Sequence, residues 1–70
     1  MDNKIKIGEK IRLLRKKNDV TQDKLAYYLG VTPQAVSKWE RELSCPDIIL
    51  LPEIARVLGV TVSYLLGADS

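Results

Sequence analysis

The pair Val-Thr occurs three times in this chain, each time with an apolar residue five positions after the valine. The three copies are Val20-Thr21 with Leu25, Val31-Thr32 with Val36, and Val60-Thr61 with Leu65. At the start of a helix, a threonine hydroxyl accepts a hydrogen bond from an otherwise unpaired amide of the first turn. The valine before it packs on the apolar residue as a hydrophobic staple. Each copy therefore predicts the beginning of a helix.

Glycines mark three helix ends. Gly30, Gly59 and Gly67 each follow an apolar stretch, and glycine readily adopts the left-handed conformation that closes many helices. Pro33 falls at the first position of a predicted helix, where its missing N–H is no loss. These signals predict helices at about 22–29, 33–41 and 62–66.

Two more helices are predicted from the spacing of apolar residues. The stripe in residues 4–17 follows the i, i+4, i+7 rule of one buried helical face and consists of Ile7, Ile11 and Leu14. The stripe in residues 48–58 consists of Ile48, Leu51, Ala55 and Leu58. Because Pro52 removes one backbone hydrogen bond, we expect a kink or a loose turn before a regular helix from about residue 52. The predicted fold class is all-α, a five-helix bundle in one domain of residues 1–70.

Composition argues against several classes of protein. With 46% hydrophobic and 29% charged residues, the chain has the make-up of an ordinary globular domain. No apolar run approaches the ~18 residues of a membrane span and no secretory signal pattern is present, so we expect a cytoplasmic protein. The chain has no histidine and one cysteine, Cys45, which leaves no usual ligand set for zinc and no evident groups for acid–base catalysis. We expect neither enzyme activity nor a metal or cofactor, and interpret Cys45 as a small apolar filler.

Basic residues concentrate at the N-terminal end of the chain. Residues 1–20 hold seven of the eleven lysines and arginines against three acids, whereas residues 41–70 hold two bases and four acids. The net charge of +2 is too small to indicate nucleic-acid binding by itself. The uneven distribution fits such binding, but it fits a solvated helix face equally well.

The most informative functional pattern lies in residues 22–41. The two helices predicted there are joined only by residues 30–32, a short glycine-containing turn that is typical of a helix-turn-helix motif. The residues that face inward in this segment are Ala26, Val31, Val36 and Trp39. The outer side of the second helix then carries Gln34, Ala35, Ser37, Lys38 and Arg41.

Four segments of the chain form one set. They are residues 7–15 (IGEKIRLLR), 21–26 (TQDKLA) with 30–32 (GVT), 36–41 (VSKWER) and 54–60 (IARVLGV). Together they closely resemble the phage-repressor family of helix-turn-helix domains, the Cro- and Xre-like regulators, over about residues 5–66. The resemblance implies a five-helix bundle whose third helix lies in the major groove of double-stranded DNA. It also implies that Gln22 binds a DNA phosphate.

Candidate base-reading side chains lie on the third predicted helix. Glutamine can pair with adenine, lysine can donate to guanine, and serine can donate or accept. We therefore expect base contacts from Pro33, Gln34, Ser37 and Lys38. Phosphate contacts are expected from Gln22, Thr32, Arg41, Leu43 and Ser44, with Gln22 at a helix start, where free amides attract phosphate. The alternative is that these residues form only the solvent-facing side of an amphipathic helix.

Arg15 and Glu40 are charged residues on helical faces that otherwise pack inward. In the resembling family, residues at these positions form a salt bridge between the first and third helices; the alternative is two unrelated surface charges. The chain departs from many relatives at Glu42 and Leu43, where they have glycine and a basic residue. The amides of Leu43 and Ser44 are still able to donate to a phosphate, but Glu42 would be repelled unless its side chain turns away.

The resemblance implies a transcriptional regulator, a repressor more readily than an activator, with double-stranded DNA as its partner. We expect an inverted-repeat operator and a weak homodimer, completed on DNA, whose interface consists of Val62, Tyr64 and Leu65. Because a fold does not prove its function, a protein-binding adaptor stays open as the alternative, and an antitoxin that represses its own operon would combine both roles. RNA is disfavoured, since the A-form major groove is too narrow for a reading helix.

Overall fold

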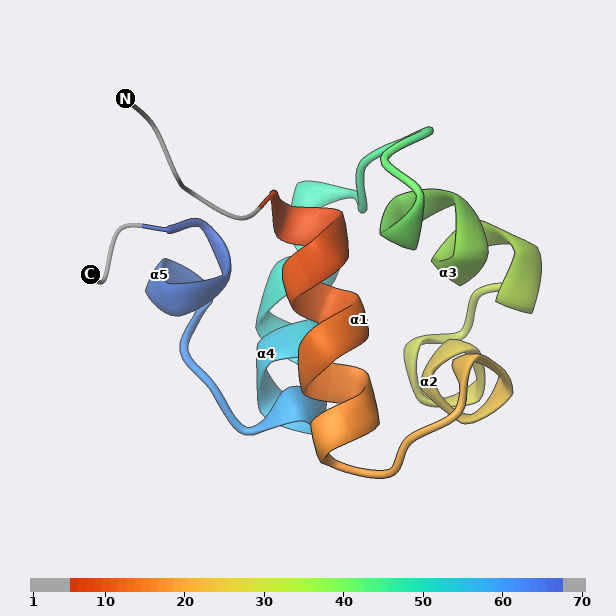
Figure 1. The fold of residues 1–70 in the computed structure, drawn as a ribbon, viewed down its shortest axis with the longest axis horizontal. Helices are drawn as coiled ribbons and strands as arrows, with labels where there is room; N and C mark the ends of the chain where they lie inside the picture. Colours follow the sequence, from red (N-terminus) through yellow and green to blue (C-terminus); the bar gives the residue numbers. More distant parts are fainter. Residues whose placement is uncertain (1–5, 68–70) are drawn as a thin grey trace.

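The computed structural model describes residues 6–67, which contain five α-helices and no β-strand. Figure 1 shows α1 passing in front of α4, with α2 and α3 on one side of this pair and α5 on the other. The helices are α1 (Ile7–Lys17), α2 (Gln22–Leu29), α3 (Pro33–Glu40), α4 (Leu51–Leu58) and α5 (Val62–Leu65). The predicted all-α, five-helix fold is confirmed for these residues.

The predicted helix bounds differ from the structure mainly at the N-terminal end. Lys6 precedes α1 in an extended conformation, with φ −68° and ψ 158°, so the helix begins at Ile7. The prediction began at residue 4, and residues 4 and 5 lie outside the described part of the chain. The third and fifth helices each end one residue earlier than predicted, at Glu40 and Leu65.

Threonine side chains begin three of the helices, as the repeated Val-Thr pairs predict. The hydroxyls of Thr21, Thr32 and Thr61 each accept a hydrogen bond from the amide three residues later, at 3.0, 3.1 and 3.0 Å. Each bond pairs an amide that the helix itself leaves free. Because these bonds are local, the residue at which α2, α3 and α5 each begin can be predicted from the neighbouring sequence.

The segment around Pro52 contains the irregular turn that the proline predicts. Ile48–Leu50 forms a short 3-10 helix, η1, and the regular helix α4 follows from Leu51 with Pro52 in its first turn. The Asp47 carboxylate accepts the Ile49 amide at 3.2 Å and so begins η1. The predicted stripe is wrong at Ile48, which is 76% exposed, because it lies in the 3-10 turn, where α-helical spacing does not apply.

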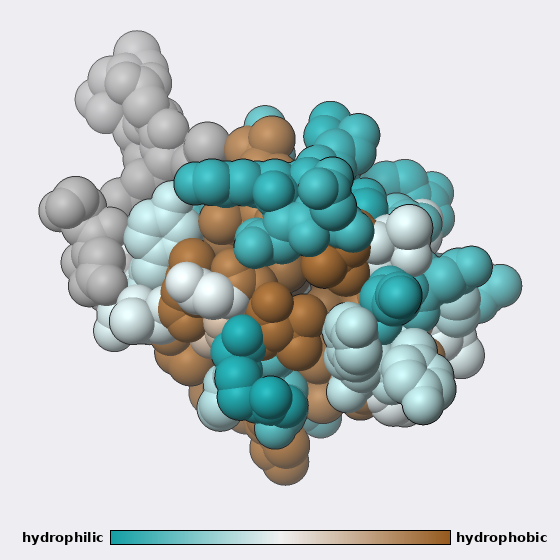
Figure 2. All heavy atoms as spheres, turned by 90° about the horizontal axis from the view of Figure 1, so that it is seen from below, coloured by the Kyte–Doolittle hydropathy of each residue, from teal (hydrophilic) through white to brown (hydrophobic). Residues whose placement is uncertain are grey.

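Every helix contributes to a single apolar core. Its buried members are Ile11, Leu25, Ala26, Leu29, Val36, Trp39, Leu51, Ile54, Ala55, Leu58 and Leu65. Burial is incomplete on the face seen from below in Figure 2, where apolar side chains reach the surface at the centre and hydrophilic ones border them. Some exposed apolar surface is expected, since a chain of about this length buries only roughly 60% of what its unfolded form exposes.

Candidate nucleic-acid interface

The turn between α2 and α3 fixes the angle at which the two helices meet. Gly30 closes α2 with φ 71°, in the left-handed region that favours glycine. The Val31 amide donates to the Ala26 carbonyl at 3.0 Å, and Thr32 caps α3 directly afterwards. Leu25 and Ala26 are buried between the helices. The inner side of α3 is therefore held by α2 and α1, whereas Gln34 and Lys38 on its outer side are exposed.

A row of polar side chains occupies that outer side. Gln34 and Lys38 are exposed and Ser37 is half-buried, whereas Val36 and Trp39 point into the core. Pro33, at the first position of the helix, is also exposed. The structure thus brings together the four residues predicted to contact bases.

Arg41, at the end of α3, folds back along the same side of the helix. Its Nε donates to the Ser37 hydroxyl oxygen at 3.3 Å and to the Ser37 carbonyl at 3.4 Å. The Ser37 hydroxyl accepts in this contact and keeps its own hydrogen for a further partner. Within residues 6–67 the other four guanidinium N–H groups of Arg41 make no hydrogen bond and stay available to an anion.

A buried ion pair joins α1 to α3 beneath this row. Arg15 donates through Nε to Glu40 Oε2 at 2.7 Å and through Nη2 to Glu40 Oε1 at 3.0 Å. The guanidinium also donates through Nη1 to the Val20 carbonyl at 2.9 Å. The two side chains are 10% and 2% exposed. The predicted salt bridge is present in the structure, and it is bidentate.

Gln22 contacts this pair, which sequence reasoning did not anticipate. Its amide Nε2 donates to Glu40 Oε1 at 3.0 Å. A carboxylate only accepts hydrogen bonds, so the contact settles which end of the Gln22 amide faces Glu40. The second hydrogen on Nε2 stays available for another acceptor, and Gln22 is half-buried at the start of α2. The predicted phosphate ligand is therefore held in a set orientation by Glu40.

The remaining predicted phosphate ligands lie at the two ends of α3. Thr32 is exposed, and its hydroxyl accepts the Ala35 amide and keeps its own hydrogen to donate. The Leu43 amide donates to the Lys38 carbonyl at 2.9 Å. This corrects the expectation for Leu43, whose amide is used in closing α3. The Ser44 amide has no hydrogen-bond partner among residues 6–67.

The predicted dimer surface on α5 needs a correction. Leu65 is 1% exposed and belongs to the core, so it offers nothing to a second chain. Tyr64 is 40% exposed and Val62 is half-buried. Lys10 of α1 lies against Tyr64, with Nζ 2.9 Å from the Tyr64 carbonyl oxygen and 4.8 Å from the centre of the ring. Of the three predicted interface residues, only Val62 and Tyr64 therefore offer surface to a second chain.

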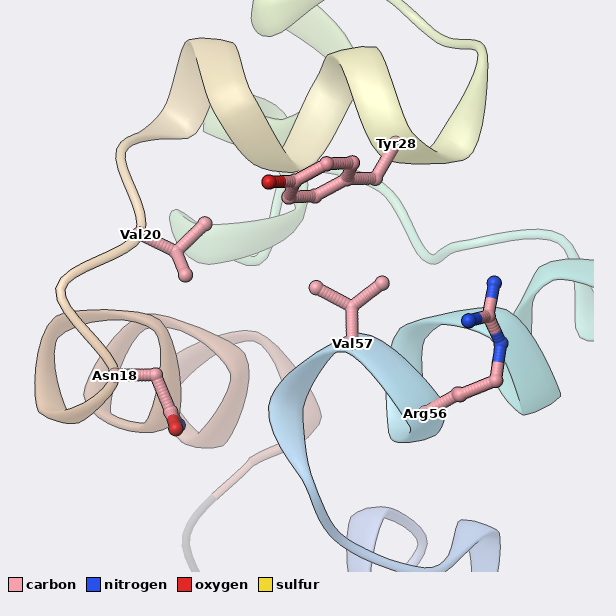
Figure 3. Close-up of a pocket in the computed structure, with 5 residues that line it drawn as sticks. All are labelled: Asn18, Val20, Tyr28, Arg56 and Val57. Carbon is pink, nitrogen blue, oxygen red and sulfur yellow. The ribbon is translucent and has the colours of Figure 1, made fainter.

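A shallow hollow lies away from the polar row of α3. Figure 3 shows Tyr28 of α2 and Val57 of α4 on its two sides, with Val20, Asn18 and Arg56 nearby. Arg56 also pairs with Glu53 one turn earlier in α4. Within residues 6–67 no group of three or more histidines, cysteines and acids is placed to hold a metal ion. In the same part of the chain, no helix is long and apolar enough to cross a bilayer.

Comparison with known proteins identifies the family. The sequence profile of the helix-turn-helix family matches residues 11–65, from α1 to the end of α5. The chain belongs to this helix-turn-helix family. The match includes the α2–turn–α3 unit and the buried pair between α1 and α3.

Two curated relatives are transcriptional regulators. Repressor protein C2 of Salmonella phage P22 is 36% identical over 63 residues, which cover 90% of this chain and 29% of that protein. The transcriptional activator BcrR of Enterococcus faecalis is 34% identical over 65 residues, covering 93% of this chain and 32% of that protein. The chain thus spans less than a third of either relative.

A solved structure of the phage repressor has the same fold. The P22 c2 repressor in complex with a synthetic operator matches with a TM-score of 0.86 and 35% identity, over 94% of this chain and 100% of that chain. The likeness confirms the resemblance to phage-repressor domains that the sequence motifs indicate.

The same fold also occurs inside an enzyme. Hydroxypropylphosphonic acid epoxidase from S. wedmorenis matches with a TM-score of 0.76 and 30% identity, over 84% of this chain but 31% of that chain. The function of this chain therefore has to be argued from the residues on its surface rather than from its fold.

Proposed function

We propose that this chain binds double-stranded DNA in a sequence-specific way, with α3 in the major groove, and regulates transcription. The observation that carries the proposal is the row of Gln34, Ser37 and Lys38 on the outer side of α3. The helix is braced from behind by α2 and by the Arg15–Glu40 pair. A reading helix needs both features, because its side chains must reach base edges from a fixed backbone.

Each side chain of the row matches a base edge in chemistry. Gln34 presents a donor and an acceptor, which suits adenine N6 and N7, and Lys38 donates to guanine O6 and N7. Ser37 has a hydroxyl hydrogen for either base, and Pro33 offers an apolar contact such as a thymine methyl requires. We assign base reading to these four residues.

Phosphate contacts on either side of the groove would orient α3. Gln22 bridges two anions in this arrangement, with one Nε2 hydrogen on Glu40 Oε1 and the other on a phosphate oxygen. Thr32 donates its hydroxyl hydrogen, Arg41 supplies a positive charge, and Ser44 donates its free amide. These contacts act on every sequence alike, since phosphates carry no direct information about the bases.

A protein-binding adaptor is the main alternative to DNA binding. An adaptor helix presents apolar anchors at the centre of its contact, whereas the exposed positions of α3 are polar apart from Pro33. Exposed tyrosines lie on α2 instead, with Tyr27 81% and Tyr28 50% exposed, so an additional protein contact would form there. An antitoxin that also binds DNA would use both surfaces. In each of these roles the protein acts in the cytoplasm and is not itself an enzyme.

Selection from random duplex DNA tests the proposal. The chain is incubated with a library of random duplexes, and the bound fraction is amplified and sequenced over several rounds. We expect one enriched motif, arranged as an inverted repeat. The matched control is the double variant Gln34→Ala/Lys38→Ala, which alters only exposed residues and should fold normally. A library that stays unenriched by the unaltered chain would contradict sequence-specific DNA binding.

The chain is proposed to bind its operator as a weak dimer through Val62 and Tyr64. A patch of this size falls well short of the roughly 1,200 Å² that stable interfaces bury, so we expect monomers in free solution. Pairing beside a two-fold axis would set two copies of α3 about 34 Å apart, one turn of B-DNA. The inverted repeat, rather than the interface alone, would then hold the dimer together.

Tyr64→Lys should weaken binding to a two-half-site duplex by about fivefold or more, because it removes the coupling between the two copies. Binding to a one-half-site duplex should not change. Tyr27→Lys is the matched control, since it adds the same charge at an exposed position on α2. Titration of both duplexes, with sedimentation of the free protein, checks this. Undiminished cooperativity in Tyr64→Lys would show that the interface lies elsewhere.

A further inference from the structure

The first turn of α1 is capped by Glu42, which lies two residues beyond the end of α3. Lys6, which precedes α1, makes no side-chain hydrogen bond to the helix. The amide of Glu9 instead donates to Oε2 of Glu42, at 3.0 Å and 33 positions along the chain. The carboxylate thus lies where the positive end of the helix dipole favours an anion.

Glu42 occupies a backbone conformation that usually belongs to glycine. Its φ is 61°, in the left-handed region. Its amide donates to the Trp39 carbonyl at 3.0 Å, and the next amide, of Leu43, donates to the Lys38 carbonyl at 2.9 Å. These two bonds form a Schellman closure, whose left-handed residue is glycine in most helices. A side chain at this position costs conformational energy, which the hydrogen bond from the Glu9 amide to the Glu42 carboxylate offsets.

Gly8 provides the space for that contact. A Cβ atom at Gly8 would lie 1.9 Å from the Trp39 carbonyl oxygen and 2.5 Å from Oε2 of Glu42. Any larger residue would separate the start of α1 from the end of α3. Gly8, the Trp39 carbonyl and the Glu42 carboxylate therefore form one fitted contact between the two helices.

The contact also sets the direction of the chain after α3. The segment that follows Glu42 carries the Ser44 amide, which has no hydrogen-bond partner among residues 6–67. With its carboxylate on α1, Glu42 holds this segment at a fixed place relative to the outer side of α3. The same bond directs the negative charge to the N-terminus of α1, which lowers its repulsion of a nearby phosphate.

We propose that Glu42 is a positioning residue for the DNA backbone. By capping α1 across the fold, it fixes the turn that presents the Ser44 amide to a phosphate. The proposal rests on the DNA-binding function proposed above, and it adds a residue whose charge alone would argue against a place beside DNA.

Three substitutions separate the cap from the charge. Glu42→Gln removes the charge and keeps an oxygen that accepts the Glu9 amide. Glu42→Ala removes both the charge and the acceptor. Glu42→Gly removes both as well, but relieves the left-handed backbone, so it is the variant best able to fold. Since Gln and Ala leave the same net charge, their difference measures the cap alone.

Binding is measured on the duplex obtained by selection, at a temperature where circular dichroism shows each variant folded. One phosphate at a time in that duplex is replaced by an uncharged methylphosphonate. We expect Glu42→Gln to bind at least as tightly as the unaltered chain. Glu42→Ala and Glu42→Gly should bind up to about tenfold more weakly than Glu42→Gln, as the loss of one hydrogen bond between uncharged groups implies. They should also lose sensitivity to one particular methylphosphonate.

Two further outcomes decide the matter. Equal affinities and equal methylphosphonate profiles for Glu42→Gln and Glu42→Ala would overturn the positioning role while leaving DNA binding intact. If the unaltered chain bound no duplex, both the proposed function and this role would fail. Hydrogen exchange at the Glu9 amide gives an independent check, because its protection should persist in Glu42→Gln and disappear in Glu42→Ala.

Discussion

Replacing Arg15 by methionine should lower the free energy of unfolding by about 3 to 5 kcal/mol. The substitution leaves the Glu40 carboxylate, 2% exposed, without the guanidinium that donates two hydrogen bonds to it. It also removes the bond to the Val20 carbonyl, which ties the chain between α1 and α2. Small domains have total stabilities of only about 5 to 15 kcal/mol, so the loss should be large enough to bring the variant close to unfolding.

Urea titration followed by circular dichroism measures this effect. The matched control is Lys16→Met, one residue further along α1, where the side chain is exposed and the change should stay within about 0.5 kcal/mol. Equal urea midpoints for the two variants would show that the pair contributes nothing to stability.

The double variant Arg15→Met/Glu40→Met separates two contributions to stability: the attraction within the pair, and the cost of leaving one buried charge unpaired. Replacing both charges with apolar side chains of similar size is often neutral or stabilising, whereas leaving one charge alone is costly. We therefore expect the double variant to be more stable than Arg15→Met. The double variant should instead have a lower affinity for DNA, because Gln22 would lack the carboxylate that orients its amide.

Features that depend on neighbours along the chain could be predicted from sequence. Thr21 and Thr32 cap their helices by accepting hydrogen bonds from amides three positions later in the sequence. Gly30 is the left-handed residue between them. Together these local signals fix the α2–turn–α3 unit, and periodicity then assigns Val36 and Trp39 to the core. The other positions of α3 must then face outward, and these positions form its polar row.

Features that depend on distant segments could not be derived in this way. The acceptor for the Glu9 amide is Glu42, and no spacing rule connects residues 33 positions apart. A left-handed glutamate is also contrary to propensity, so sequence alone placed Glu42 only by asking that it turn away from DNA. Leu65 is a different case: the staple with Val60 predicts that it packs inward, as its 1% exposure confirms, so only its place in the dimer interface was wrong. The Arg15–Glu40 pair was anticipated only through resemblance to a family.

Gln34→Ala should cost about 1 to 3 kcal/mol of binding free energy at one base position of the operator and little at the others. Gln34 is exposed and makes no hydrogen bond within residues 6–67, so its loss should leave the stability of the fold unchanged. In the variant, the adenine edge that the Gln34 amide is proposed to contact would be left unpaired. Binding assays on a panel of duplexes that each carry one base change check this, because discrimination should disappear at a single position.

Gln22→Ala is the matched comparison, since it removes the same amide group from a place that should face a phosphate. It should weaken binding to every duplex in the panel by a similar factor, because phosphate contacts carry no base information. It also removes a hydrogen bond to Glu40, so both variants are assayed at a temperature where circular dichroism shows them folded.

The ratio of affinities between duplexes is the deciding quantity. Gln34→Ala should change this ratio at one base position, and Gln22→Ala should leave it constant. An unchanged preference profile for Gln34→Ala would remove Gln34 from the reading surface, and a position-specific effect of Gln22→Ala would mean that α2, rather than α3 alone, reaches the bases.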